Sequence, residues 1–94
     1  MKTKLDEARE IINEVDNEMI YLFIKRMAAV SMVAEYKMEN NIPVLDSSRE
    51  EVIKTKNLDT LSNKQLEKYY LTFFEGVLNS SKEYQKDLVE KNNK

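Results

Sequence analysis

The chain has 94 residues, of which 34% are charged and 41% hydrophobic, and its formal net charge is −2. It contains no Cys and no His, which excludes disulfides, thiolate nucleophiles, Cys or His metal ligands and the commonest general base. The small negative charge gives no general attraction to nucleic acid, no apolar run approaches the roughly 20 residues of a membrane helix, and the first residues lack the apolar core of a signal peptide. We therefore expect a single-domain, soluble, cytoplasmic protein.

The first predicted element is a helix over residues 3–39. Gly76 and Pro43 are the only Gly and Pro of the chain, so long helices and an all-α fold are expected. Apolar residues of this segment recur at spacings of three and four: Leu5, Ala8, Ile11, Ile12, Val15, Met19, Leu22, Phe23, Val30, Val33 and Ala34. Such a helix is roughly 50 Å long, whereas a compact chain of this size has a radius of gyration of only about 12 Å. Its apolar stripe therefore predicts a second copy of the chain as a partner.

Two cations interrupt this stripe. Arg26 and Lys37 are eleven residues apart, about three helical turns, so they point the same way. They are either snorkelling charges or an anion site built into a helix bundle. Arg9 lies about 25 Å before Arg26 along the axis, which is too far for one small ligand. Arg9 is either an exposed cation beside acidic neighbours or a residue that an antiparallel partner helix brings to Arg26.

The next segment is a loop over residues 40–47. Asn40 and Asn41 tolerate left-handed backbone and Pro43 breaks the helix, after which Asp46, Ser47 or Ser48 can cap a second helix over residues 48–57. Four charged residues then meet at one helix–loop–helix corner, where they form either solvated surface or part of a site: Lys37, Asp46, Arg49 and Glu50.

A third helix is predicted over residues 62–90. Ser81 and Gln85 lie on one face of it and follow Val77 and Leu78, so they are either a half-buried polar pair or ordinary surface. The chain has no phosphate loop, nucleophile elbow or zinc spacing. What remains is a set of fixed cations and hydrogen-bonding groups. Such a set can bind a polyanion and can catalyse only reactions that need positioning and electrostatics.

Three stretches together resemble the all-helical (AroQ-class) chorismate mutases. They read LDEAREIINEVDNEMIYLFIKRMAAVSMVAEYK, NNIPVLDSSREE and FFEGVLNSSKEYQ, and they span nearly the whole chain. Each catalytic position of the family has a fitting residue here: Arg9, Arg26, Lys37, Asp46, Arg49, Glu50, Ser81 and Gln85. The resemblance implies three helices per chain in an intertwined homodimer, in which each site borrows the first-helix arginine of the other chain.

The resemblance also implies the reaction. It is the intramolecular Claisen rearrangement of chorismate to prephenate, on the route to phenylalanine and tyrosine, with no cofactor, metal or covalent intermediate. Arg26 and the partner subunit's Arg9 would hold the two carboxylates of the substrate. Arg49 would steady the acidic corner and the carboxylate end, and Ser81 would contact a carboxylate or complete the local network.

The remaining implied roles concern the ether oxygen and the ring hydroxyl. Lys37 and Gln85 would donate hydrogen bonds to the ether oxygen, where negative charge gathers in the transition state. Glu50 would accept from the ring hydroxyl, with Asp46 nearby. Because a glutamine donates at any pH, Gln85 predicts a rate profile without a sharp acid optimum.

Two other functions compete with this one. An isochorismate–pyruvate lyase shares the fold, but Glu50 and Ser81 favour the mutase, since that group carries bulkier or apolar residues there. A non-catalytic dimerisation or regulatory module would use Arg26 and Lys37 as partner-facing or snorkelling charges.

Overall fold

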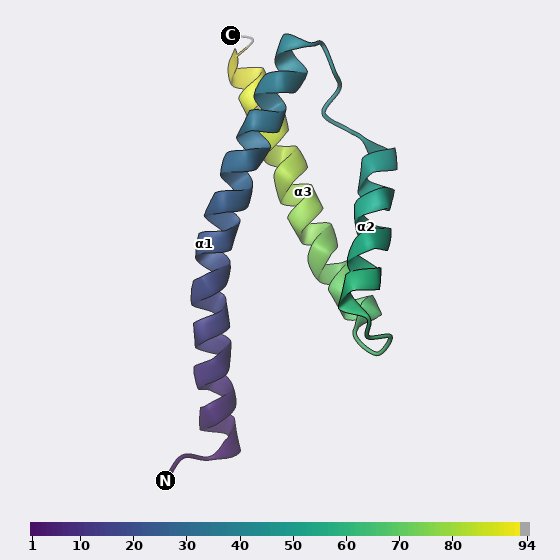
Figure 1. Cartoon of the computed structure of the whole chain (residues 1–94). Coiled ribbons are helices and arrows are strands. Elements are labelled where there is room, and N and C mark those ends of the chain that lie inside the picture. Colours follow the sequence, from purple (N-terminus) through teal and green to yellow (C-terminus); the bar gives the residue numbers. More distant parts are fainter. Residues whose placement is uncertain (93–94) are drawn as a thin grey trace.

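The structure, a computed structural model, describes residues 1–92 and contains three helices in that range (Figure 1). They are α1 (Lys4–Glu39), α2 (Ser47–Leu61) and α3 (Glu67–Asn92). No strand occurs within residues 1–92, so the predicted all-α fold of one long, one short and one medium-long helix is confirmed. None of the helices in this range combines the length and the apolar character that crossing a bilayer requires.

Helix α1 occupies the segment predicted for it because both of its ends carry strong local signals. The hydroxyl of Thr3 accepts from the backbone N–H of Asp6 at 3.1 Å, and the Asp6 carboxylate accepts from the backbone N–H of Thr3 at 3.1 Å. This reciprocal capping box satisfies two backbone donors that a helix start leaves free. At the other end Asn40 caps the helix and Asn41 takes a left-handed backbone, with φ of 55°. The chain can therefore turn away into the loop that leads to α2.

The predicted end of the second helix and the predicted start of the third were wrong. Helix α2 was expected to end near residue 57 but continues to Leu61, and Ser62 ends it in a left-handed conformation with φ of 47°. Helix α3 was expected to start at residue 62 but begins at Glu67 and reaches Asn92. The side chain of Asn63 accepts from the backbone N–H groups of the residues two and three positions later, at 3.1 and 3.3 Å. These local bonds form a turn that delays the helix.

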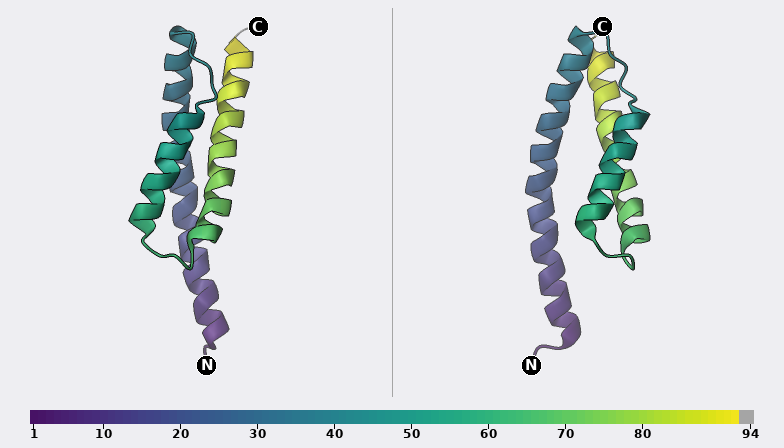
Figure 2. Two further views of the ribbon diagram at one scale, coloured as in Figure 1. Left: turned by 90° about the vertical axis from the view of Figure 1, so that its right-hand side faces the viewer. Right: turned by 45° about the vertical axis from the view of Figure 1, so that its right-hand side comes forward.

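Helix α3 holds the molecule together (Figures 1 and 2). It packs against both α1 and α2, whereas the backbones of α1 and α2 nowhere come within contact distance of each other in residues 1–92. Helices α1 and α3 run in the same direction and meet toward their C-terminal ends, and α2 returns alongside α3. The buried apolar residues lie on α1 and α3: Val30, Ala34, Phe74 and Leu78. This small core fixes the upper part of α1 to α3 and leaves α2 with no buried residue.

The N-terminal half of α1 projects beyond the rest of the chain (Figure 2). The molecule measures 58 × 28 × 15 Å and has a radius of gyration of 17.0 Å, against about 12 Å for a compact chain of this length. Residues of the predicted apolar stripe are exposed along this half and just beyond it: Leu5, Ile11, Ile12, Val15, Met19, Leu22 and Phe23. A single chain therefore leaves a long apolar surface uncovered, which is unusual for a stable monomer.

Candidate active site

One cavity collects most of the residues that the sequence predicts for a site. It has a volume of about 320 Å³ and is lined by α1, by the loop and first turns of α2, and by α3. Its apolar walls include Val30, Val33, Ile53 and Leu78. Seven of the eight predicted site residues line it: Arg26, Lys37, Asp46, Arg49, Glu50, Ser81 and Gln85. The backbones of α1 and α2 are not in contact, and side chains of both helices line the cavity together with side chains of α3.

Arg26 is held by α3. Its Nη1 donates a hydrogen bond to the hydroxyl of Ser81, which is buried and itself donates to the carbonyl of Val77 at 3.0 Å. The bond to Ser81 is the only hydrogen bond or ion pair of Arg26 within residues 1–92, although a guanidinium has five N–H donors. Arg26 therefore keeps donors for a bound anion while one edge of it is fixed.

Lys37 is fixed by two oxygen acceptors. Its Nζ donates to the carbonyl of Val44 at 2.8 Å and to Oε1 of Gln85 at 3.2 Å. Gln85 is only 7% exposed, so its orientation is set by the packing of α3 and by this bond. Since the amide oxygen of Gln85 faces the ammonium, its NH₂ group is left as a donor. Lys37 and Gln85 together offer hydrogen-bond donors at one point of the cavity.

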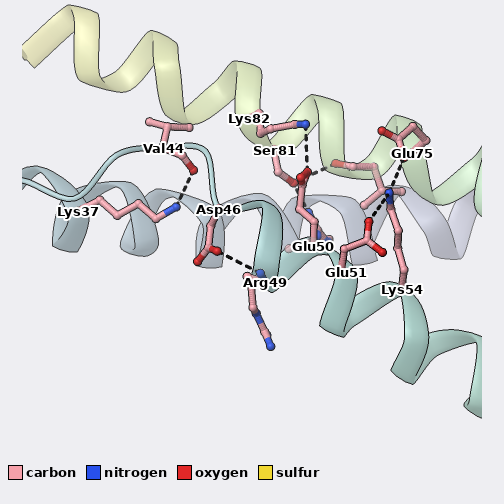
Figure 3. Close-up of polar contacts among 12 residues, drawn as sticks. Lys37, Val44, Asp46, Arg49, Glu50, Glu51, Lys54, Glu75, Ser81 and Lys82 are labelled. Carbon is pink, nitrogen blue, oxygen red and sulfur yellow. Dashed lines mark hydrogen bonds and ion pairs between the residues drawn. The ribbon is translucent and has the colours of Figure 1, made fainter.

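The start of α2 places the acidic residues (Figure 3). Asp46 caps the helix, and its Oδ1 accepts from the backbone N–H of Arg49 at 3.0 Å and from the hydroxyl of Ser48 at 3.0 Å. These two hydrogen bonds, the backbone one being the stronger influence, hold the pKa of Asp46 below its usual value of 3.8. Glu50 is half-buried one turn later and pairs with Lys82 of α3 at 3.0 Å.

We expect Asp46→Ala to destabilise the protein at neutral pH, because α2 then loses its cap. A carboxyl whose pKa is lowered on folding stabilises the fold at pH values above 3.8, and this stabilisation is lost as pH falls through the lower pKa of the folded state. The difference in the free energy of unfolding between wild type and Asp46→Ala should therefore become smaller as the pH is lowered from 7 to about 3. Denaturant unfolding at matched chain concentrations measures it, with Asp59→Ala as control, since the Asp59 carboxylate makes no hydrogen bond within residues 1–92. If this difference in the free energy of unfolding grew as the pH was lowered, the assigned role of the Asp46 carboxylate would be contradicted.

Lys82 lines the cavity and was not predicted from the sequence. The sequence feature that could have identified Lys82 is its position four residues after Leu78 and three before Gln85, which puts it on the same face of α3. Its presence matters for the charge of the cavity. Four cationic and two anionic side chains line the cavity, which gives it a net charge of +2: Arg26, Lys37, Arg49, Lys82, Asp46 and Glu50. That charge complements a small dicarboxylate.

Arg9 is the predicted site residue that the chain does not bring to the cavity. It is exposed on the projecting N-terminal half of α1, as its spacing from Arg26 requires. Within residues 1–92 no group of three or more acidic side chains is arranged to hold a metal ion. The cavity thus offers fixed cations and neutral donors, and the residues that line it include no Ser–His or Cys–His type nucleophile pair. Its chemistry is that of binding, orientation and charge stabilisation.

Comparison with known proteins gives a family match and several relatives. A family model described as Chorismate mutase type II matches residues 8–86. A bifunctional chorismate mutase/prephenate dehydratase of Buchnera aphidicola subsp. Schizaphis graminum (strain Sg) is 32% identical over 91 residues, which are 96% of this chain and 24% of the relative. The protein of the same description from Buchnera aphidicola subsp. Baizongia pistaciae (strain Bp) is 35% identical over 95 residues, 99% of this chain and 25% of the relative. The chain thus spans about a quarter of the length of these two relatives.

A shorter relative shares a smaller part of the chain. The chorismate mutase of Methanocaldococcus jannaschii is 40% identical over 53 residues, which are 56% of this chain and 54% of that protein. No solved structure matches the chain significantly.

Proposed function

The chain belongs to the chorismate mutase type II family, as its resemblance in sequence predicted, and on that premise we propose that it rearranges chorismate to prephenate. The observation that carries the proposal is the cavity with a net charge of +2, in which Arg26 and Lys37 are each held by a neutral acceptor of α3, Ser81 and Gln85. An intramolecular rearrangement needs the substrate to be folded and its developing charge to be stabilised. Both tasks suit fixed hydrogen-bond donors and need no nucleophile.

The first step is to hold the two carboxylates of chorismate. Arg26 offers a guanidinium whose fork matches a carboxylate, and Ser81 fixes one of its nitrogens. The partner subunit's Arg9 would supply the second guanidinium. Two cations that hold both ends of the substrate restrict the enolpyruvyl arm to the conformation in which the new C–C bond can form. This lowers the entropic part of the barrier.

The second step is to stabilise the breaking C–O bond. Negative charge grows on the ether oxygen as this bond lengthens, so donors aimed at that oxygen act more strongly in the transition state than in the ground state. Lys37 and the amide NH₂ of Gln85 are the donors proposed for this task. The 3.2 Å bond between them supports this, because it fixes both groups before the substrate arrives.

The ring hydroxyl needs a hydrogen-bond acceptor. Glu50 lines the cavity, is half-buried and is the acceptor proposed for it, with Asp46 one turn earlier at the same helix start. Arg49 lines the cavity with an exposed side chain and is proposed to steady the carboxylate end of the substrate.

A homodimer is part of the proposal. It is supported by the uncovered apolar surface of α1 and by the remoteness of Arg9 from the cavity of its own chain. In an intertwined pair, the projecting half of each α1 would lie against the other chain and carry Arg9 into the other site. A cytoplasmic location is also proposed, and it rests on the sequence arguments alone.

The purified chain should consume chorismate at a rate that greatly exceeds the protein-free rate, and it should form prephenate in equal amount. Loss of the ultraviolet absorbance of chorismate measures the first, and acid conversion of prephenate to phenylpyruvate measures the second. Isochorismate is the matched second substrate. Release of pyruvate from isochorismate without turnover of chorismate would identify a lyase instead, and turnover of neither substrate would identify a non-catalytic module and contradict the proposal.

A further inference from the structure

The ion pair between Glu50 and Lys82 is the one charged link between α2 and α3 that lies inside the cavity (Figure 3). The Nζ of Lys82 is 3.0 Å from Oε1 of Glu50, and the two side chains are only 26% and 18% exposed. Within residues 1–92, Oε2 of Glu50 accepts no hydrogen bond. One oxygen of the carboxylate is therefore tied to α3, and the other remains able to accept.

We propose that Lys82 is a positioning residue, which holds Glu50 by one oxygen so that the other meets the ring hydroxyl of the substrate. This inference rests on the proposed function. A free glutamate side chain has several rotatable bonds, and ordering it on binding costs free energy. Helix α2 has no buried residue, so its own packing restrains Glu50 weakly. The cation of Lys82 removes this freedom before the substrate binds.

Lys82 lies on the part of α3 that also holds the cations of α1. Lys82 directly follows Ser81, which holds Arg26, and it precedes Gln85, which holds Lys37. Ser81 and Gln85 are both buried, so this part of α3 is a fixed reference for the cavity. Through Lys82, the carboxylate of Glu50 is attached to α3, the helix that also holds Arg26 and Lys37. The position of Glu50 relative to the α1 cations is thereby fixed through α3, although the backbones of α1 and α2 are not in contact.

A purely structural clamp is the competing explanation, and the chain provides a matched control for it. Lys54 of α2 pairs with Glu75 of α3 at 3.1 Å, and this pair joins the same two helices outside the cavity lining. The bond to Glu75 is the main reason why the pKa of Lys54 is raised above its usual 10.5. If Lys82 served only to attach α2, removal of Lys54 would have the same consequence.

The test compares the kinetics of single variants on chorismate. Lys82→Gln should raise KM by about tenfold to a hundredfold. It should leave kcat within about threefold, because the hydroxyl contact exists in both the ground state and the transition state. Lys82→Arg, which keeps the cation, should stay within about threefold of wild type in both parameters. Lys54→Gln should leave both parameters near the wild-type values. Helicity and thermal midpoints confirm that each variant is folded.

A double variant decides whether Lys82 acts through Glu50. In a Glu50→Ala background, Lys82→Gln should add less than about a twofold change, since the carboxylate that it positions is gone. If Lys82→Gln raised KM as much in the Glu50→Ala background as in the wild type, Lys82 would contact the substrate itself, and the inference would be overturned. So would normal kinetics of Lys82→Gln, or an equal defect in Lys54→Gln. Wild-type protein that leaves chorismate untouched would instead reject the proposed function, and this inference with it.

Discussion

Arg26→Ala is expected to remove nearly all of the proposed mutase activity, with kcat/KM falling by about 1,000-fold, which corresponds to roughly 4 kcal/mol. The loss is large because Arg26 is half-buried, is fixed by Ser81 and is the only guanidinium of its own α1 that lines the cavity. Without it a substrate carboxylate would enter the cavity unpaired. Steady-state kinetics on chorismate measure the effect, with circular dichroism to show that α1 still forms.

The same variant tests whether two chains share a site, as the proposed homodimer requires. Arg9→Ala should be as inactive as Arg26→Ala when each is assayed alone. If the variants are unfolded together and refolded as a mixture, half of the dimers are mixed, and one site in each mixed dimer contains both arginines. The mixture should therefore recover about a quarter of the wild-type activity. Recovery of no activity would show that both arginines must come from one chain, which the projecting geometry of α1 argues against.

Lys37→Ala is expected to lower kcat by about 10²- to 10³-fold, or roughly 3–4 kcal/mol, with a much smaller change in KM. This pattern follows if Lys37 acts on charge that appears mainly in the transition state. Lys37 also anchors the loop through its 2.8 Å bond to the carbonyl of Val44. Lys37→Gln can still donate to that carbonyl, so a similar defect in this variant would separate the charge from the anchoring.

Lys25→Ala is the control for this prediction, since Lys25 is an exposed cation of the same helix and does not line the cavity. It should leave kcat within about twofold of wild type. A Lys37→Ala protein with normal kcat and raised KM would contradict the assigned role, because it would place Lys37 in ground-state binding alone.

The fold was predictable where one local signal dominated. Helix α1 has no internal breaker, and its start depends on the neighbours Thr3 and Asp6, so its extent follows from the sequence alone. The connection between α2 and α3 was not predictable in the same way. Leu58 and Leu61 continue α2 and are half-buried in the folded chain. Their burial is a property of tertiary packing, which outweighs the weak propensities of the segment.

The candidate site divides along the same line. Residues on rigid helices, such as Arg26 and Lys37, could be placed together by counting turns, and the cap at Asp46 follows from its residue type. Lys82 could not be assigned, because its partner Glu50 lies on another helix and their distance depends on how α2 is seated on α3. The sequence shows that Lys82 and Gln85 share a face of the helix. The pairing of Lys82 with Glu50 could be recognised only from the tertiary structure.

The projecting half of α1 has a consequence for how this protein responds to dilution. If a complete site needs an arginine from another chain, the number of working sites follows the law of mass action, and below the dissociation constant it rises with the square of the chain concentration. Specific activity would then fall on dilution, and added fresh chain would restore it. The exposed apolar residues of α1 also make the separated chain the species most prone to aggregate. Assembly would therefore govern both the catalytic capacity and the solubility of the chain.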